Sequence, residues 1–154
     1  MAPIDAGNAG GLMGERGDRL ERLAGFPDVV AMAARSADER PTPGGEWTPE
    51  QVARHLIAVD LEVHQRRLRD IAEHDDPSWS WQEPGPWTDE PELGLNGVLA
   101  RFAGVRAETV GMYRALDDAG WARTGRHATF GRLDADGLLG LAVDHDQEHL
   151  GGLT

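Results

Sequence analysis

The sequence contains no cysteine and no lysine, because all 15 of its basic residues are arginine. Without cysteine the chain has no disulfide bonds, no thiolate metal ligands and no cysteine nucleophile. Without lysine it has neither a Schiff-base residue nor the lysine that a P-loop requires. The lack of cysteine fits a cytoplasmic protein, which is what we expect. Demanding chemistry is therefore left to the six histidines, the carboxylates and any ion that they hold.

Positive charge is also scarce, since 27 acidic residues outweigh the 15 basic ones and the net charge is −12. Such a chain repels a phosphate backbone, and we see no local basic stripe, so we expect no binding of nucleic acid or of anionic membranes. No apolar run reaches the roughly 18 residues of a transmembrane helix. The first residues lack the basic start and apolar stretch of a secretory signal, so we expect none.

A chain of 154 residues has the size of one domain. We interpret residues 1–13, which are rich in glycine and alanine and lack periodicity, as a flexible N-terminal tail, and residues 14–154 as the folded domain. Strict alternation of apolar and polar residues, which indicates strands, is not found. Apolar residues instead recur at helical spacing in four segments, at about residues 15–37, 48–73, 92–118 and 134–150. The sequence therefore predicts an all-α fold, a four-helix bundle.

Two local signals refine the first two helices. Pro27 lies inside the first predicted helix and should kink it or split it. The second helix has a clear start, because Thr48 can cap it, Pro49 occupies the first helical position and Gln51 completes a capping box.

Two long loops separate the later helices, at residues 74–91 and 119–133. The first contains Trp79, Trp81 and Trp87, several acids and no arginine. Loops of this length are usually functional or disordered, and disordered segments are poor in aromatic residues. The three tryptophans are therefore candidates for a substrate pocket or for a cover over a site. The alternative is that they pack across the bundle or form a dimer interface.

Three of the six histidines suggest a site. His145 and His149 lie four residues apart in the last helix, so both rings project from one face. Such a pair can bind one metal ion, or else both rings lie on a solvated last turn, where the helix dipole favours imidazolium. His55 lies on the apolar face of the second helix, where a buried ring needs a partner for each nitrogen. A metal ion is one solution, and a core hydrogen bond is the commoner one.

The other histidines, His64, His74 and His127, are assigned to solvent or to local structure. His64 follows His55 by nine residues, about 180° around a helix, so it should face away from that ring. Glu62 returns to nearly the face of His55, where it can hydrogen-bond a ligand or remain a partly exposed acid.

The string HDQEH, which ends at His149, matches H-x-x-E-H, a metallopeptidase pattern in which the glutamate is the general base. That pattern needs a third ligand well downstream, and only five residues follow His149, so we do not expect a peptidase of that class. The catalytic residue is left open, with Glu148 and Glu62 as candidates.

At this point two segments resemble a known family. PGGEWTPEQVARHL, which includes His55, is similar to the second-helix signature of the DinB-like family of metal-binding four-helix bundles. LAVDHDQEHL, with His145 and His149, is similar to the signature of its last helix, and Arg106 fits an arginine of its third helix. The resemblance covers about residues 15–152.

The resemblance implies a divalent metal ion bound by His55, His145 and His149, with zinc as the first expectation and nickel or iron as alternatives. It also implies a thiol-dependent S-transferase or a hydrolase that acts on a small molecule, with a low-molecular-weight thiol as a cosubstrate in the first case, and a homodimer. A non-catalytic metal- or ligand-binding dimer is the alternative. Three protein ligands leave an open position, as in catalytic zinc sites. Candidates to orient the ligand rings are Asp144, Asp146 and Glu148.

A shared metal site would also constrain the topology. His55 lies near the start of the second helix, whereas His145 and His149 lie near the end of the fourth. These ends meet only if the second and fourth helices are antiparallel, which requires one long crossover connection. Residues 74–91 can span roughly 60 Å at about 3.3 Å per residue. The metal hypothesis therefore predicts that this loop runs back along the bundle.

Overall fold

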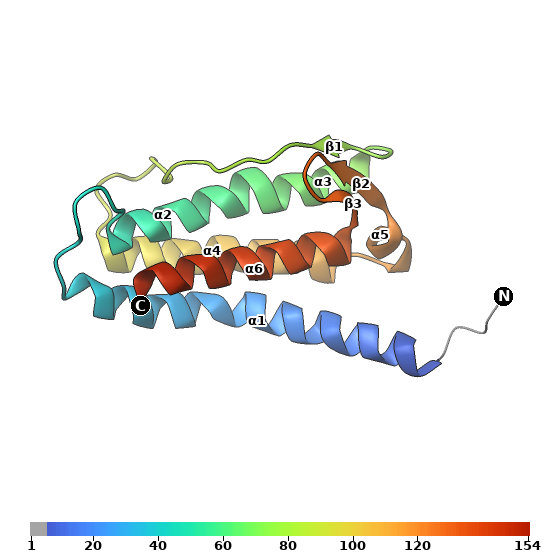
Figure 1. Ribbon diagram of the computed structural model, residues 1–154, viewed down its shortest axis with the longest axis horizontal. Helices are drawn as coiled ribbons and strands as arrows, with labels where there is room; N and C mark the ends of the chain where they lie inside the picture. The colour runs from blue at the N-terminus through green and yellow to red at the C-terminus, as the bar shows by residue number, and fades with distance from the viewer. Residues whose placement is uncertain (1–5) are drawn as a thin grey trace.

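The computed structural model describes the backbone of residues 6–154 and the side chains of residues 14–154. Four long helical segments form the predicted bundle (Figure 1). They are α1 (Ala6–Asp38), a second segment made of α2 (Pro49–Val59), η1 (Asp60–His64) and α3 (Gln65–Glu73), then α4 (Leu95–Arg114) and α6 (Ala135–Leu153). Among the described residues, none of these helices combines the length and the hydropathy needed to cross a membrane.

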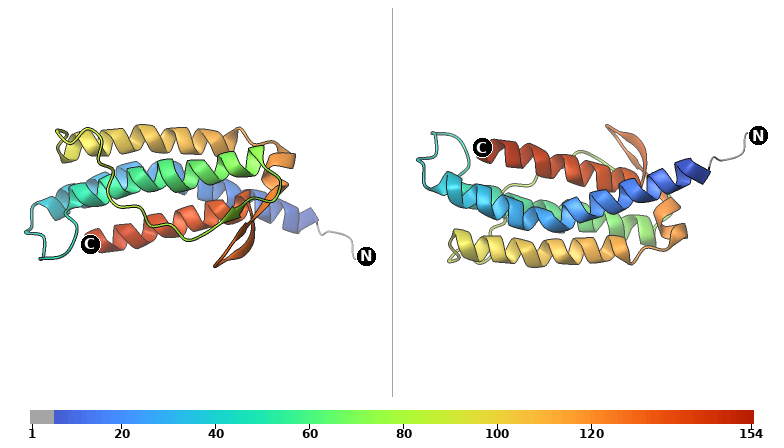
Figure 2. Two further views of the ribbon diagram at one scale, coloured as in Figure 1. Left: turned by 90° about the horizontal axis from the view of Figure 1, so that it is seen from above. Right: turned by 90° about the horizontal axis from the view of Figure 1, so that it is seen from below.

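The first helix is longer than predicted and is not split. It begins at Ala6, within the segment that we interpreted as a tail, and our prediction for residues 1–5 lies outside the described residues. Pro27 is inside α1, and Figure 2 shows the helix bending along its length. Because proline has no N–H, the carbonyl of Leu23 lacks its usual partner four residues on. Arg106 donates a hydrogen bond of 3.1 Å to that carbonyl and so compensates for the proline.

The second helical segment begins as predicted. The Thr48 side chain accepts a hydrogen bond from the Gln51 backbone at 3.2 Å, and the Gln51 side chain accepts one from the Thr48 backbone at 2.8 Å. Between α2 and α3, however, five residues form a π-helical turn, closed by a bond from the Gln65 N–H to the Asp60 carbonyl. A π-turn contains one more residue than an α-turn, so every side chain after it points in a different direction around the helix axis than regular α-helical spacing predicts.

The crossover loop runs back along the bundle, as the metal hypothesis predicted (Figures 1 and 2). At one end β1 (Ser78–Trp79) pairs with β2 (Thr124–His127), near the end of α3. At the other end the Trp87 N–H donates a 3.0 Å bond to the Arg54 carbonyl in α2. As a result α2 and α4 are parallel, and α6 runs antiparallel to α2 (Figure 1).

A small sheet stands where the sequence pattern predicted only a loop. β1 is parallel to β2, and β2 is antiparallel to β3 (Gly131–Asp134). The short helix α5 (Asp118–Ala122) directly precedes β2 in the chain. Strands of two and four residues are too short to show an alternation of apolar and polar residues in the sequence. They are stabilised by backbone hydrogen bonds between the strands. A side chain at Gly125 would collide with the ring of Trp79, so the close approach of β1 and β2 depends on this glycine.

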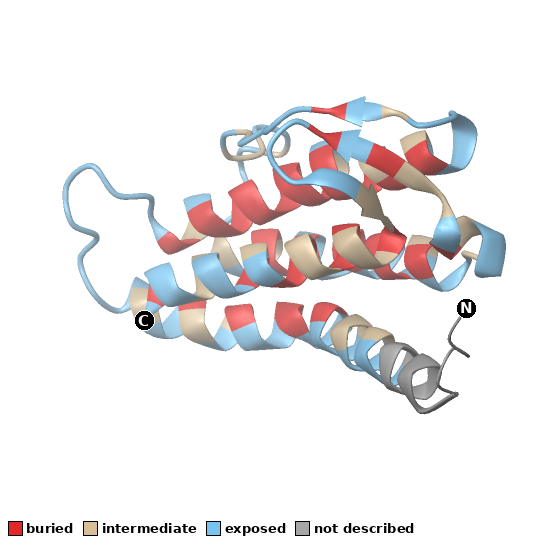
Figure 3. Ribbon diagram, turned by 45° about the vertical axis from the view of Figure 1, so that its right-hand side comes forward, coloured by how far each residue is buried: buried red, intermediate tan, exposed pale blue. Residues whose placement is uncertain are grey.

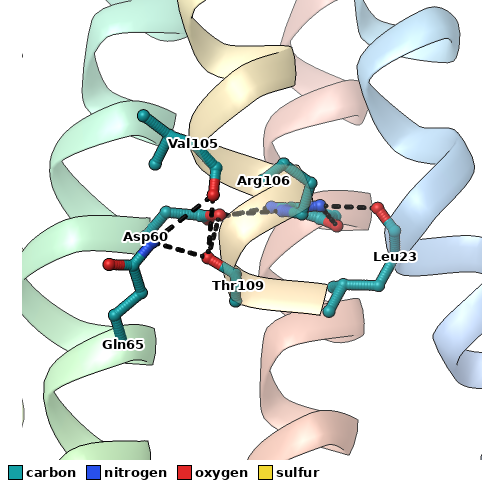
Figure 4. Close-up of polar contacts among 7 residues, drawn as sticks. Leu23, Asp60, Gln65, Val105, Arg106 and Thr109 are labelled. Atoms are coloured by element: carbon teal, nitrogen blue, oxygen red, sulfur yellow. Dashed lines mark hydrogen bonds and ion pairs between the residues drawn. The ribbon is translucent and has the colours of Figure 1, made fainter. Parts of the chain in front are cut away.

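Buried residues occur along all four helical segments (Figure 3), and most of the apolar ones form two large clusters. A buried polar network also joins the helices inside the bundle (Figure 4). Arg106, in α4, donates two bonds to Asp60 at 2.9 and 3.0 Å and two to Asp146 at 2.7 and 2.8 Å. Thr109 donates a 2.8 Å bond to Asp60 and accepts one from Gln65 at 3.1 Å. We call these five residues, with the Leu23 carbonyl, the Arg106 network.

The Arg106 network fixes the helices relative to one another. Burial alone would lower the pKa of Arg106, but the two carboxylates outweigh it and raise that pKa. Burial also raises the pKa of Asp146 to about 6, although Arg106 acts in the opposite direction. Because the network joins α1, η1, α4 and α6, it sets the register of α6 against the second helical segment.

Candidate metal centre

The structure brings His55, His145 and His149 together. The Nε2 atom of His55 lies 3.3 Å from Nε2 of His145 and 3.1 Å from Nε2 of His149. His55 comes from α2 and is fully buried, whereas the other two rings, on consecutive turns of α6, are partly exposed. The antiparallel arrangement of the two helices is what allows this meeting.

A fourth donor joins the three rings, and the sequence analysis did not identify it. Oε1 of Glu83 lies 3.1 Å from Nε2 of His55 and 3.8 Å from Nε2 of both His145 and His149. The four ligand atoms all lie within 4.8 Å of one another. We call His55, Glu83, His145 and His149 the donor cluster. Glu83 belongs to the crossover loop, so the backtracking of this loop completes the cluster.

The same loop sets the orientation of His55. The Pro84 carbonyl lies 2.7 Å from Nδ1 of His55. A carbonyl can only accept, so Nδ1 carries the proton and Nε2 offers its lone pair to the donor cluster. The ring of Trp47 lies beside it, with a centroid distance of 4.8 Å. His55 is therefore held in the tautomer that a metal ligand needs.

Burial and the neighbouring histidines favour the neutral form of the two rings on α6. Burial, followed by the neighbouring histidines, lowers the pKa of His145 to about 2. Burial and His55 lower the pKa of His149 as well, although Glu148 and Glu83 act in the opposite direction. Neutral imidazole is the form that coordinates a cation.

The spacing of the donors fits a bound cation. Zn–N bonds of 2.0–2.1 Å in a tetrahedral arrangement place the ligand atoms roughly 3.3 Å apart, and Nε2 of His55 lies 3.1, 3.1 and 3.3 Å from the other three ligand atoms. With the His55 tautomer fixed, its Nε2 lone pair faces two other ring nitrogens and a carboxylate oxygen. A divalent cation would satisfy all four at once.

Asp146 does not orient a ligand ring, although the sequence made it a candidate for that role. It lies between the two α6 histidines in sequence, but its carboxylate points to Arg106 on the other side of the helix. One face of α6 therefore carries Asp146, which anchors the helix through Arg106, and the other carries His145 and His149, which belong to the donor cluster.

His64 is where the sequence prediction was wrong. It was expected to face away from the site, yet it is buried, and its ring lies edge-on to that of His145 with centroids 6.0 Å apart. The π-turn explains the error, because the extra residue changes the angle from His55 to about 80° instead of about 180°. Burial lowers the pKa of His64 to about 4, and its Nε2 has no hydrogen-bond partner among the described residues.

A cavity of about 220 Å³ opens beside the donor cluster and shares Glu83 and His145 with it. Of the three tryptophans proposed for a pocket, Trp81 lines this cavity. Trp79 instead is buried against the apolar core, and its Nε1 donates a 3.1 Å bond to Asp70. Trp87 packs on the core near Arg54. The remaining lining residues are Val59, Val63, His64, Arg67, Gln82, His127, Phe130, Leu141, Asp144 and Glu148.

The two candidates for a catalytic acid or base lie in different places. Glu148 lines the cavity, next to the donor cluster. Glu62 is exposed in the π-turn and lines two neighbouring pockets instead of this cavity. Of the histidines assigned to local structure, His74 ends α3 and is exposed, whereas His127 is buried in β2.

The fold and the donor cluster define a class of protein, the helical bundles that collect histidines from two antiparallel helices. The chain belongs to the DinB superfamily, whose family model matches residues 19–153. Its structure is similar to that of YfiT from Bacillus subtilis, which is described as a probable metal-dependent hydrolase with an unusual four-helix bundle topology. The TM-score is 0.68 and the identity 22%, over 88% of this chain and 82% of that one. None of the curated proteins matches the chain.

Proposed function

We propose that the protein is a metal-dependent enzyme that acts on a small molecule. The observation that carries this proposal is the meeting of three Nε2 atoms, one of them 3.1 and 3.3 Å from the other two, at the edge of a cavity. His55, His145 and His149 would hold the ion. When bound, a divalent cation supplies Lewis-acid chemistry and lowers the pKa of a coordinated water or thiol.

The surrounding residues have separate tasks. The Pro84 carbonyl orients His55, and Asp146 anchors the helix that carries the other two ligands. The apolar residues of the cavity exclude water from the body of a substrate. Glu148 lines the cavity next to His145, where it can take or give a proton.

Two reaction classes fit this arrangement. A hydrolase is supported by the likeness to YfiT, which is described as a probable hydrolase of this kind. A thiol-dependent S-transferase is compatible with the sequence, but the chain has no cysteine, so the thiol would come from a separate small molecule. Zinc is our first candidate for the ion, with nickel or iron as alternatives, since histidine sites accept all three.

One observation favours a non-catalytic site as a second candidate. Glu83 adds a fourth protein donor, and four protein ligands are typical of closed, structural zinc sites. In that case the ion would hold the crossover loop against α6.

Metal analysis and turnover assays test the proposal together. Untagged protein should contain or tightly bind one divalent ion per chain, and His55→Ala should lose it. Hydrolysis of small esters and amides, and transfer from low-molecular-weight thiols to electrophiles, should then depend on the ion and on His149. Metal binding without any turnover would favour the structural site, and absence of metal binding would overturn both candidates.

We also propose that the substrate is a small molecule, that the protein forms a homodimer and that it is located in the cytoplasm. Light scattering on purified protein tests the homodimer, for which a mass of twice 16.7 kDa is expected.

A further inference from the structure

The cavity beside the donor cluster has a cationic end. Arg67, from α3, lines it and is half-buried, yet it takes part in none of the ion pairs found among the described residues. Its Nη2 donates a 3.2 Å bond to the Ser80 carbonyl and lies 3.3 Å from Nε2 of His127. Its charge therefore has no ion-pair partner among the described residues, and an anionic ligand could supply one.

The contact between Arg67 and His127 is not a hydrogen bond. The backbone N–H groups of Thr129 and Phe130 both donate to Nδ1 of His127, at 3.0 and 3.3 Å. Nδ1 is therefore unprotonated, and the neutral ring carries its proton on Nε2. Burial and Arg67 lower the pKa of His127, which keeps the ring neutral. Two N–H donors thus face each other, and His127 is only 3% exposed.

Two converging donors need an acceptor between or beside them. An unsatisfied buried donor is energetically costly, and an oxyanion would satisfy Nη2 of Arg67 and Nε2 of His127 together. The lining carboxylates of Glu83, Asp144 and Glu148 also belong to the cavity, so an anionic group is favoured at the Arg67 end and disfavoured beside them. Arg67 follows His55 by twelve residues in the same helical segment, about 18 Å along its axis, so the cationic end lies away from the donor cluster.

Between these ends the cavity is apolar and aromatic. Trp81 and Phe130 face each other with ring centroids 6.3 Å apart, and Phe130 lies 4.8 Å from the ring of His127. Both aromatic side chains are about half exposed, at 58% and 45%, so both can contact a ligand in the cavity that they line. A volume of about 220 Å³ suits a molecule smaller than a typical drug.

We propose that this cavity binds a small monoanion with an apolar or aromatic body. Its carboxylate, sulfonate or phosphonate group binds Arg67 and Nε2–H of His127, and its body packs on Trp81 and Phe130. The opposite end of the molecule then points to the donor cluster. The direction of the molecule rests on the proposed function, whereas the binding of the anion does not, because Arg67 and His127 belong to neither the donor cluster nor its supports.

Calorimetry on the full-length protein, stripped of metal with EDTA, tests the binding. The probes are phenylacetate and its neutral isostere phenylacetamide, with benzenesulfonate and benzylphosphonate to distinguish the type of oxyanion. Phenylacetate should bind at least about ten-fold more tightly than phenylacetamide, because hydrogen bonds to a charged acceptor are stronger than those to a neutral one. No detectable binding of any of the three oxyanions, or equal binding of acid and amide, would overturn the proposal.

Variants identify the residues. Arg67→Gln should remove the preference for the acid, whereas Arg66→Gln, which deletes the same charge from an exposed neighbour, should keep it. His127→Asn should weaken phenylacetate binding several-fold, since asparagine keeps an acceptor for the two backbone N–H groups but lacks the Nε2 donor. A preference that survives Arg67→Gln in a folded protein, as judged by circular dichroism, would refute the assignment.

The metal affinity of Arg67→Gln separates this inference from the proposed function. It should equal that of the wild type. If the wild type binds phenylacetate through Arg67 but binds no metal, the anion site stands and the proposed function fails. If metal binds and Arg67→Gln leaves the acid preference intact, the opposite holds.

Discussion

The donor cluster and the Arg106 network lie on opposite sides of the same turns of α6, yet they are built in opposite ways. In the Arg106 network every donor meets an acceptor, since Arg106 donates to two carboxylates and to a backbone carbonyl. In the donor cluster, four atoms that can each bind a metal ion converge, since Nε2 of His55 lies close to two ring nitrogens and a carboxylate oxygen. Complementary groups stabilise a fold by themselves, whereas a convergence of potential ligand atoms suits a cation.

This difference fits an architectural role for the Arg106 network and the metal site that we propose for the donor cluster. The Arg106 network is closed and fully buried, and it connects all four helical segments. The donor cluster is open on one side, includes a loop residue and borders a cavity. Variants that break one cluster should therefore leave the property of the other largely intact.

The largest effect is expected for Arg106→Met. The substitution leaves two buried carboxylates without a partner, and removing one side of a buried ion pair costs about 3–5 kcal/mol. Chemical denaturation of metal-free protein should show this decrease in the free energy of unfolding. Arg101→Met, on the exposed side of the same helix, should cost less than about 1 kcal/mol. Similar values for the two variants would contradict an architectural role for Arg106.

A second large effect, on metal affinity and not on folding, is expected for His149→Ala. Even groups that only support metal ligands contribute 10–100-fold, so the loss of a ligand should weaken binding by more than about 100-fold. Competition with a chromophoric chelator measures this change. His74→Ala, in an exposed position, is the matched control and should change nothing. If His149→Ala bound zinc as tightly as the control, the donor cluster would not be a metal site.

An intermediate effect is expected from pH, through His64, which lies between the two clusters. The folded state keeps this ring neutral down to about pH 4, whereas the unfolded chain takes up a proton below about pH 6.5. Acid therefore favours unfolding in this window, by about 1.4 kcal/mol per pH unit. The free energy of unfolding of metal-free wild type should fall more steeply from pH 6.5 to 5 than that of His64→Asn. Parallel curves would mean that His64 is not held neutral.

The smallest effect is expected for Glu83→Gln. Glu83 is partly exposed, and the variant keeps an oxygen but loses the charge, so metal affinity should fall by about ten-fold. Glu62→Gln, the other acid considered from the sequence, should change the affinity by less than about two-fold because Glu62 lies outside the donor cluster. Cobalt absorption spectra should also differ from wild type for Glu83→Gln alone. An unchanged spectrum would remove Glu83 from the coordination shell.

Much of the fold could be predicted from the sequence because its signals are local and periodic. The capping box at Thr48 and the apolar spacing gave the helices, and the need to bring His55 to His145 predicted the crossover. The π-turn could not be predicted, since no periodicity marks a single inserted residue, and it alone made the placement of His64 wrong.

The candidate site could be predicted from the sequence only in part, because only some of its residues lie in periodic elements. Its histidines lie on helices, where spacing predicts direction, whereas Glu83 lies in an irregular loop where it does not. The acidic, tryptophan-rich composition of that loop was the available signal, and only the fold shows that Glu83 and Trp81 reach the site while Trp79 and Trp87 pack elsewhere. The contact between Arg67 and His127 depends on the small sheet, which the sequence did not indicate.

Anomalous diffraction from crystals grown with zinc, collected on both sides of the zinc absorption edge, tests the central claim most directly. The account predicts one strong anomalous peak per chain, within bonding distance of Nε2 of His55, His145 and His149. A peak elsewhere, or three rings in place with no peak between them at saturating zinc, would contradict it.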